Sequence, residues 1–153
     1  GRWFSPDPFV YVSGNLLVFY DEGDKRRHVA PDVFVAKGVP RGSRPNFLVW
    51  AEGKGPDVVI ELTSRTTRKE DSGPKLALYR DTLRVREYFL FDPFEEYLHP
   101  SMQGYRRVKD QYRPIRPTAE GRLPSRVLGL ELERDGRWLR LWNPDSRVHL
   151  RAA

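Results

Sequence analysis

The residues best suited to chemistry are two acidic side chains placed 29 positions apart, Asp32 and Glu61. Asp32 opens the apolar run Asp-Val-Phe-Val-Ala, and Glu61 interrupts the β-branched run Val-Val-Ile-Glu-Leu. A carboxylate inside a buried strand costs free energy unless a metal, a base or another partner binds it. If the two strands run antiparallel, Asp32 at the start of one lies near Glu61 at the end of the other.

Two carboxylates at one point of a sheet are suited to a hard divalent cation. Mg²⁺ (or Mn²⁺) is commonly held by one or two carboxylates together with water and substrate phosphate oxygens. Lys75 follows on a predicted helix. A lysine beside such a metal could stabilise charge or position an attacking water. Asp32, Glu61 and Lys75 are therefore the candidate catalytic residues for phosphodiester hydrolysis, with Asp32 and Glu61 as the metal ligands.

Asp57 is a possible additional site residue, but its position favours a structural role. It precedes Glu61 by four residues, which is about 13 Å along an extended strand, so both cannot easily bind one metal. An Asp after Gly55-Pro56 also suits a turn. A purely structural alternative stays open for the whole set: Asp32 and Asp57 as turn residues, and Glu61 on a half-exposed strand.

The basic residues suggest a polyanionic partner. The chain has 153 residues, a net charge of +6 and no cysteine. Arg65, Arg68 and Lys69 follow Glu61 and are candidates for contacting nucleic-acid phosphates, although a solvated face would look the same. The three histidines have no metal-ligand spacing. No apolar stretch approaches the ~20 residues of a membrane span. The lack of cysteine excludes thiolate sites and fits a cytoplasmic protein.

Predicted elements place these residues on a mixed α+β fold within a single domain, 1–153. Strands are expected at 16–20, 32–36, 47–50, 58–62 and 87–91. A helix is expected from Pro74, capped by Ser72. Residues 97–99 and 104–108 suggest one hairpin. Residues 130–133 and 138–142 suggest a second, C-terminal hairpin around Asp135-Gly136.

Four ordered motifs resemble the Uma-type family of putative restriction endonucleases, of the PD-(D/E)xK nuclease superfamily. They are residues 30–35, residues 55–64, Lys75 with Tyr79, and residues 85–93. The resemblance implies a restriction-endonuclease-like core, a mixed sheet flanked by helices, with a metal-dependent nuclease site. Asp32 matches the first acid and Glu61 the second.

The chain departs from this family pattern in three places. Thr63 stands where the superfamily's usual lysine would fall, and Lys75 matches a helical lysine that replaces it. The helix that usually precedes the first strand is expected to be absent or truncated. Gly73-Pro74 directly precedes Lys75 and affects where the helix starts. Arg84 stands where a glycine often ends the helix, so it affects the C-terminal end.

Two functional hypotheses follow. The first is a Mg²⁺- or Mn²⁺-dependent endonuclease that hydrolyses DNA. The second is a catalytically inactive nucleic-acid- or protein-binding module on the same fold. Apart from these two, the sequence also allows an oligomeric structural domain, such as a homodimer, with the C-terminal hairpin as its interface.

Overall fold

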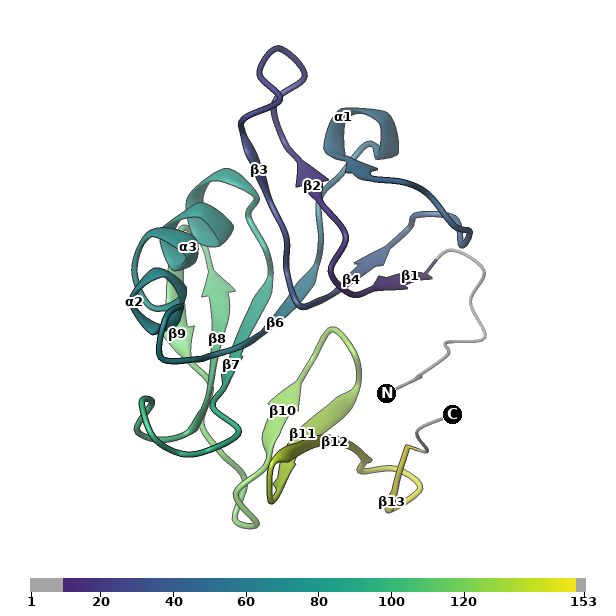
Figure 1. Ribbon diagram of the computed structural model, residues 1–153. Coiled ribbons are helices and arrows are strands. Elements are labelled where there is room, and N and C mark those ends of the chain that lie inside the picture. The colour runs from purple at the N-terminus through teal and green to yellow at the C-terminus, as the bar shows by residue number, and fades with distance from the viewer. Residues whose placement is uncertain (1–9, 151–153) are drawn as a thin grey trace.

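A six-stranded mixed sheet forms the centre of the protein (Figure 1). The structure is a computed structural model that describes residues 10–150, without the side chains of Arg68 and Glu70. In spatial order the strands are β1 (Val10–Ser13), β4 (Val33–Lys37), β6 (Val58–Leu62), β7 (Glu87–Phe91), β8 (Met102–Val108) and β9 (Gln111–Pro114). Within this sheet β6 and β7 pair in parallel, and the other neighbouring strands pair antiparallel.

The parallel pair requires a crossover, and the crossover carries the helices that approach the candidate site. It contains α2 (Arg68–Asp71) and α3 (Pro74–Ala77), and α3 continues into a π-helical turn, η1 (Leu78–Thr82). Tyr79 of this segment is fully buried against the sheet, in a cluster with Val59 and Tyr88. The helical segment thus covers one face of the sheet at β6 and β7 (Figure 1).

The opposite face of the central sheet is covered by a second, antiparallel sheet. Its strands are β10 (Leu123–Ser125), β11 (Leu130–Asp135), β12 (Trp138–Asn143) and β13 (Val148–His149). Val58 and Phe89 pack here with Leu123 and Leu132. Neighbouring strand residues therefore serve different layers, as the twofold alternation of a strand demands: Val59 faces the helices and Val58 the second sheet.

A small third sheet lies beyond β4 (Figure 1). It consists of β2 (Val18–Phe19), β3 (His28–Val29) and β5 (Phe47–Leu48), and β5 leads into the short helix α1 (Val49–Glu52). Phe47 and Val18 are fully buried and join the same cluster as Tyr79.

The fold class and the C-terminal hairpin are confirmed, and several local predictions are wrong. The strand expected at 47–50 ends at Leu48, because the helix α1 begins at Val49. Residues 97–99 form no strand; β8 pairs instead with β7 and β9. Ser72 does not cap α3, whose N-cap is Gly73 with no side-chain hydrogen bond. In the hairpin of β11 and β12, Asp135 pairs with Trp138, so the turn is Gly136-Arg137.

The expectation that the helix before the first strand is absent or truncated concerns residues 1–9, which lie outside the described part. The described part begins with β1. The central sheet carries helices on one face and a sheet on the other, where helices were expected to flank it. Over residues 10–150, none of the helices has the length and apolar character needed to cross a membrane.

Candidate metal-dependent active site

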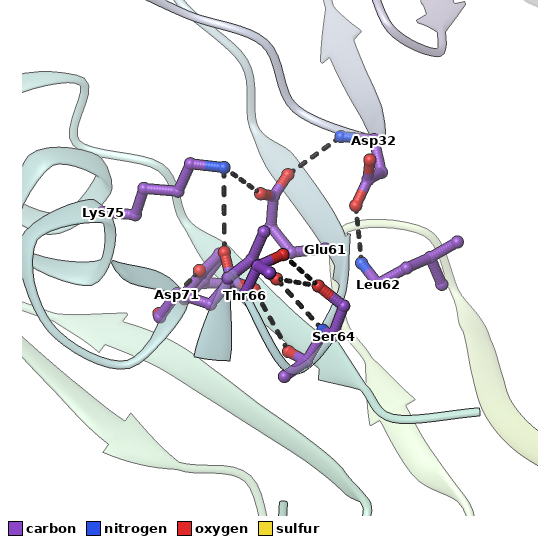
Figure 2. Close-up of polar contacts among 10 residues, drawn as sticks. Asp32, Glu61, Leu62, Ser64, Thr66, Asp71 and Lys75 are labelled. Atoms are coloured by element: carbon purple, nitrogen blue, oxygen red, sulfur yellow. Dashed lines mark hydrogen bonds and ion pairs between the residues drawn. The ribbon is translucent and has the colours of Figure 1, made fainter. Parts of the chain in front are cut away.

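Asp32 and Glu61 meet at one end of the antiparallel pair β4–β6, as their spacing predicted. Val33 pairs with Ile60, which places the two acids side by side at the next position. The Asp32 amide donates to Glu61 Oε1 at 2.9 Å, and the Leu62 amide donates to Asp32 Oδ2 at 2.7 Å (Figure 2). Each carboxylate thus accepts a backbone hydrogen bond from the other's strand, which fixes both in orientation.

Glu61 is buried because it shares the helix-facing side of β6 with Val59. Its side chain is only 1% exposed. Burial raises the pKa of Glu61, and the hydrogen bond and charge of Lys75 offset part of that rise. A glutamate with a raised pKa, enclosed by helix and sheet, is typical of a functional site rather than of a solvent-facing strand.

Lys75 reaches this carboxylate from the first turn of α3. Its Nζ donates to Glu61 Oε2 at 2.8 Å, and 24% of the side chain remains exposed. Burial by itself would lower the Lys75 pKa, but the adjacent carboxylates, first of all Glu61, outweigh burial and raise it. Lys75 is therefore an ammonium at neutral pH, and it lies beside both the buried acid and solvent.

A third acid, Asp71, belongs to the same cluster and was missed by the sequence reasoning. It ends α2, is 1% exposed, and its Oδ1 lies 3.7 Å from Lys75 Nζ. Thr63 Oγ1 donates to its Oδ2 at 3.3 Å. Burial raises the pKa of Asp71. The available signal was its position four residues before Lys75, a spacing at which side chains meet when the backbone is helical. In the structure Asp71 ends α2 and Lys75 lies in α3.

Thr63 therefore has a definite place in the site. It is buried, with its hydroxyl directed to Asp71. The chain then turns through Ser64, whose hydroxyl lies within hydrogen-bond distance of the hydroxyls of Thr66 and Thr67 (Figure 2). This hydroxyl-rich turn connects β6 to α2, so it sets the distance between Glu61 and the helical residues.

The structure places Asp57 away from these residues, at the opposite end of β6. Its Oδ2 accepts hydrogen bonds from the Lys37 amide at 2.7 Å and from Lys54 Nζ at 2.5 Å. Its carbonyl oxygen accepts the Arg86 and Glu87 amides. Asp57 thus joins the N-terminal ends of β6 and β7 to the end of β4, and it does not approach the cluster around Glu61.

The basic residues that follow Glu61 lie at the same end of the sheet. Arg65 and Lys69 are exposed, while the side chain of Arg68 falls outside the described part. Arg65 also borders an open depression of about 430 Å³ next to the carboxyl ends of β6 and β7. Its lining residues are Leu62, Thr63, Ser64, Arg65, Pro93, Phe94, Glu96 and Tyr97. Asp32, Glu61 and Lys75 do not line this depression; it adjoins the site through Leu62 and Thr63, the residues that follow Glu61.

The donor set fits a divalent cation bound by two carboxylates. Asp71 Oδ1 is buried without a hydrogen-bond donor, so the cluster has unsatisfied negative charge. Three carboxylates against one ammonium leave a formal charge of −2, which a divalent cation would balance. Across residues 10–150, no three acidic or histidine side chains are arranged to enclose a metal. Asp32 and Glu61 would hold the cation, and water and substrate oxygens would complete its shell.

Comparison with known proteins agrees with the family resemblance. A structure from Anabaena variabilis, described as a putative nuclease belonging to DUF820, superposes with a TM-score of 0.48 at 19% sequence identity. The match covers 75% of this chain and spans 63% of the Anabaena chain. No curated protein matches. The family Uma2, described as "Putative restriction endonuclease", matches residues 1–139. The chain therefore belongs to the Uma2 family.

Proposed function

We propose that the protein is a Mg²⁺- or Mn²⁺-dependent endonuclease that hydrolyses DNA phosphodiester bonds. The observation that carries the proposal is the meeting of Asp32 and Glu61 across β4 and β6, with Lys75 bonded to the buried acid. Membership of the Uma2 family supports the same assignment.

Each residue has a role that follows from its contacts. Asp32 and Glu61 hold the cation, and the backbone carbonyl near Leu62 is a further candidate ligand. The cation supplies Lewis-acid stabilisation of phosphate charge and acidifies a bound water. Lys75, an ammonium at neutral pH, orients the attacking water or stabilises the negative charge on the phosphate oxygens. The water oxygen bonds to phosphorus as the bond to the leaving oxygen breaks, and a phosphomonoester and an alcohol remain.

The surface beside the site supports a nucleic-acid substrate. Arg65 and Lys69 are exposed next to the site, and the net charge is +6. Both would contact phosphates and hold a strand near Glu61. We propose the same phosphate-contacting role for Arg68, and for its side chain this proposal rests on the sequence alone. A cytoplasmic location and a homodimer stay predictions.

Divalent-dependent cleavage tests this proposal. Supercoiled plasmid, branched DNA and single-stranded DNA are incubated with Mg²⁺ or Mn²⁺, with chelator as the negative control. We expect cutting only with the metal, and loss of at least about 100-fold in Glu61→Ala and Lys75→Ala. Glu131→Ala, which removes an acid from β11, should cut normally. A parent protein that cuts none of these substrates would exclude the endonuclease assignment.

A binding module without catalysis is the second candidate. The observation in its favour is that protein donors already bind both acids: Lys75 and the Asp32 amide on Glu61, and the Leu62 amide on Asp32. This candidate requires DNA or protein binding that does not change with metal and survives Lys75→Ala. Metal-stimulated cleavage excludes it.

A further inference from the structure

Asp71 Oδ1 is a buried carboxylate oxygen without a hydrogen bond. Such an atom is costly, because the lost hydration is not replaced. The rest of the residue is fixed: Oδ2 accepts from Thr63 Oγ1 at 3.3 Å, and the backbone carbonyl accepts from Tyr88 Oη at 2.8 Å. The free oxygen therefore cannot turn away to find another donor without breaking the contact with Thr63.

The cation facing this oxygen is Lys75, and the Thr67 hydroxyl also lies against the Asp71 carboxylate. Lys75 Nζ lies 2.8 Å from Glu61 Oε2 and 3.7 Å from Asp71 Oδ1 (Figure 2). It is therefore hydrogen-bonded to Glu61 and too far from Asp71 for a hydrogen bond. An ammonium has three donors and rotates about a flexible stem. A displacement of about 1 Å would complete a hydrogen bond of ordinary length to Asp71.

The same ammonium competes with any cation for Glu61. Lys75 Nζ lies 2.8 Å from Oε2, and the Asp32 amide bonds to Oε1. A divalent cation bound to Oε2 would repel the ammonium at that distance, so binding there displaces Lys75. A displaced ammonium that found no acceptor would remain a partly buried charge without a partner, at a cost to binding. Asp71 Oδ1 is an acceptor at the required place.

We propose that Lys75 is a resident counter-ion of Glu61 that a divalent cation exchanges, and that Asp71 is the positioning residue that receives the displaced ammonium. The inference rests on the proposed function, because it takes Glu61 as a cation ligand. Thr63 contributes by fixing Asp71 in place. In this arrangement Thr63 of the strand orients Asp71, and Asp71 receives Lys75 of the helix.

Cation affinity in a double-mutant cycle tests this exchange. Mn²⁺ and Mg²⁺ binding are measured by calorimetry for the parent, Asp71→Asn, Lys75→Met and the double variant. We expect Asp71→Asn to weaken binding about tenfold when Lys75 is present, and much less in the Lys75→Met background. Lys75→Met alone should bind the cation at least as tightly as the parent. Equal weakening by Asp71→Asn in both backgrounds would overturn the proposal, because Asp71 would then act only as a nearby charge.

Amine reactivity supplies a second readout that does not depend on turnover. Acetylation of Lys75 is followed by mass spectrometry with and without saturating Mn²⁺. In the parent, Lys75 should stay protected in both states, because Asp71 replaces Glu61 as its partner. In Asp71→Asn the metal should expose Lys75 to acetylation. Strong exposure in the parent on adding metal would contradict the transfer to Asp71.

Controls separate this inference from a folding defect and from the proposed function. Glu87→Gln alters another acid that is 1% exposed, at the far end of β7, and should leave cation affinity unchanged. If Asp71→Asn does not fold, Thr63→Val loosens Asp71 without removing its charge and should weaken binding in the same Lys75-dependent way. Coupling without any DNA cleavage would uphold the exchange and reject the endonuclease. DNA cleavage without coupling would uphold the endonuclease and reject the exchange. Absence of cation binding would reject the endonuclease and the exchange together.

Discussion

Glu61 lies in a place from which water is largely excluded, so its protonation depends on the few groups that contact it. Two donors reach it, the Asp32 amide and Lys75 Nζ. Burial still outweighs them, and the pKa of Glu61 lies above the ordinary 4.5. The protonated acid cannot be a good cation ligand, because the proton and the metal compete for the same oxygens.

The pH dependence of cation binding follows from this balance. Since the pKa of Glu61 is raised, acidification should protonate it at a pH above 4.5, and Mn²⁺ affinity should fall there rather than below that value. Lys75→Met removes the group that lowers the pKa, so in the metal-free variant the ¹³C-carboxyl NMR titration of Glu61 should move to higher pH. A midpoint at or below 4.5 in the metal-free parent would contradict this prediction.

The sequence was sufficient to pair Asp32 with Glu61 but not to include Asp71. Antiparallel register is a regular geometry, so two acids at the ends of adjacent strands could be placed together from spacing alone. Asp71 lies in a polar, charged stretch, where burial of one acid among exposed residues leaves no hydrophobic pattern. Its burial depends on the crossover returning over β6 and β7, which is a tertiary effect.

At the level of elements, the end of the crossover helix carries local strain. Arg84 adopts φ +55°, and the following Val85 amide donates to Tyr79 O at 2.8 Å. The left-handed conformation costs a non-glycine residue roughly 1–2 kcal/mol. Arg84→Gly should therefore raise the free energy of unfolding by up to about 1 kcal/mol, or a few degrees in Tm. Arg84→Ala keeps the strain and should show no such gain in thermal melts; equal gains in both variants would exclude this explanation.

Glu87 joins the central sheet to the second sheet. It is 1% exposed, and its carboxylate accepts from Ser125 Oγ at 2.5 Å, from the Arg126 amide at 2.9 Å and from Arg106 Nε at 3.3 Å. Glu87→Ala leaves Arg106 with the Pro124 carbonyl but without a carboxylate, and should lower the free energy of unfolding in urea by about 3–5 kcal/mol. Ser125→Ala removes one hydrogen bond and should cost about 1–3 kcal/mol. If Glu87→Ala lowers the free energy of unfolding by less than Ser125→Ala does, the Glu87 contacts do not hold the two sheets together.

The sequence predicts an element correctly where the signal is local, and the prediction fails where tertiary partners determine the structure. The β-branched run at β6 and the alternating pattern of β11 and β12 specify strands by themselves. Residues 47–50 are too short an apolar run to separate strand from helix. The sequence predicts a hairpin of residues 97–99 with 104–108, but β8 pairs with β7 and β9 instead. That choice depends on the sheet as a whole.

For the whole molecule, the arrangement of layers determines which surface a substrate can reach. Helices cover one face of the central sheet and the second sheet covers the other, so the site is accessible from the end of β6 where Asp32, Glu61 and Lys75 meet (Figures 1 and 2). Exposed Arg65 and Lys69 lie at this end. A polyanion that approaches here meets cations first and the buried acids afterwards, which reduces repulsion between phosphate and carboxylate.

Salt dependence of DNA binding tests that arrangement. Each phosphate contact contributes about 0.9 to the slope of log K against log salt, so Arg65→Ala and Lys69→Ala should each reduce the slope by about 1. Lys25→Ala removes an exposed lysine from the turn between β2 and β3, and should leave the slope unchanged because that turn lies far from the site (Figure 1). The slopes of the three variants are measured by fluorescence anisotropy with a labelled oligonucleotide. Divalent metal is left out so that no strand is cut. If Lys25→Ala lowers the slope as much as Lys69→Ala, binding follows the overall charge of +6 rather than this surface.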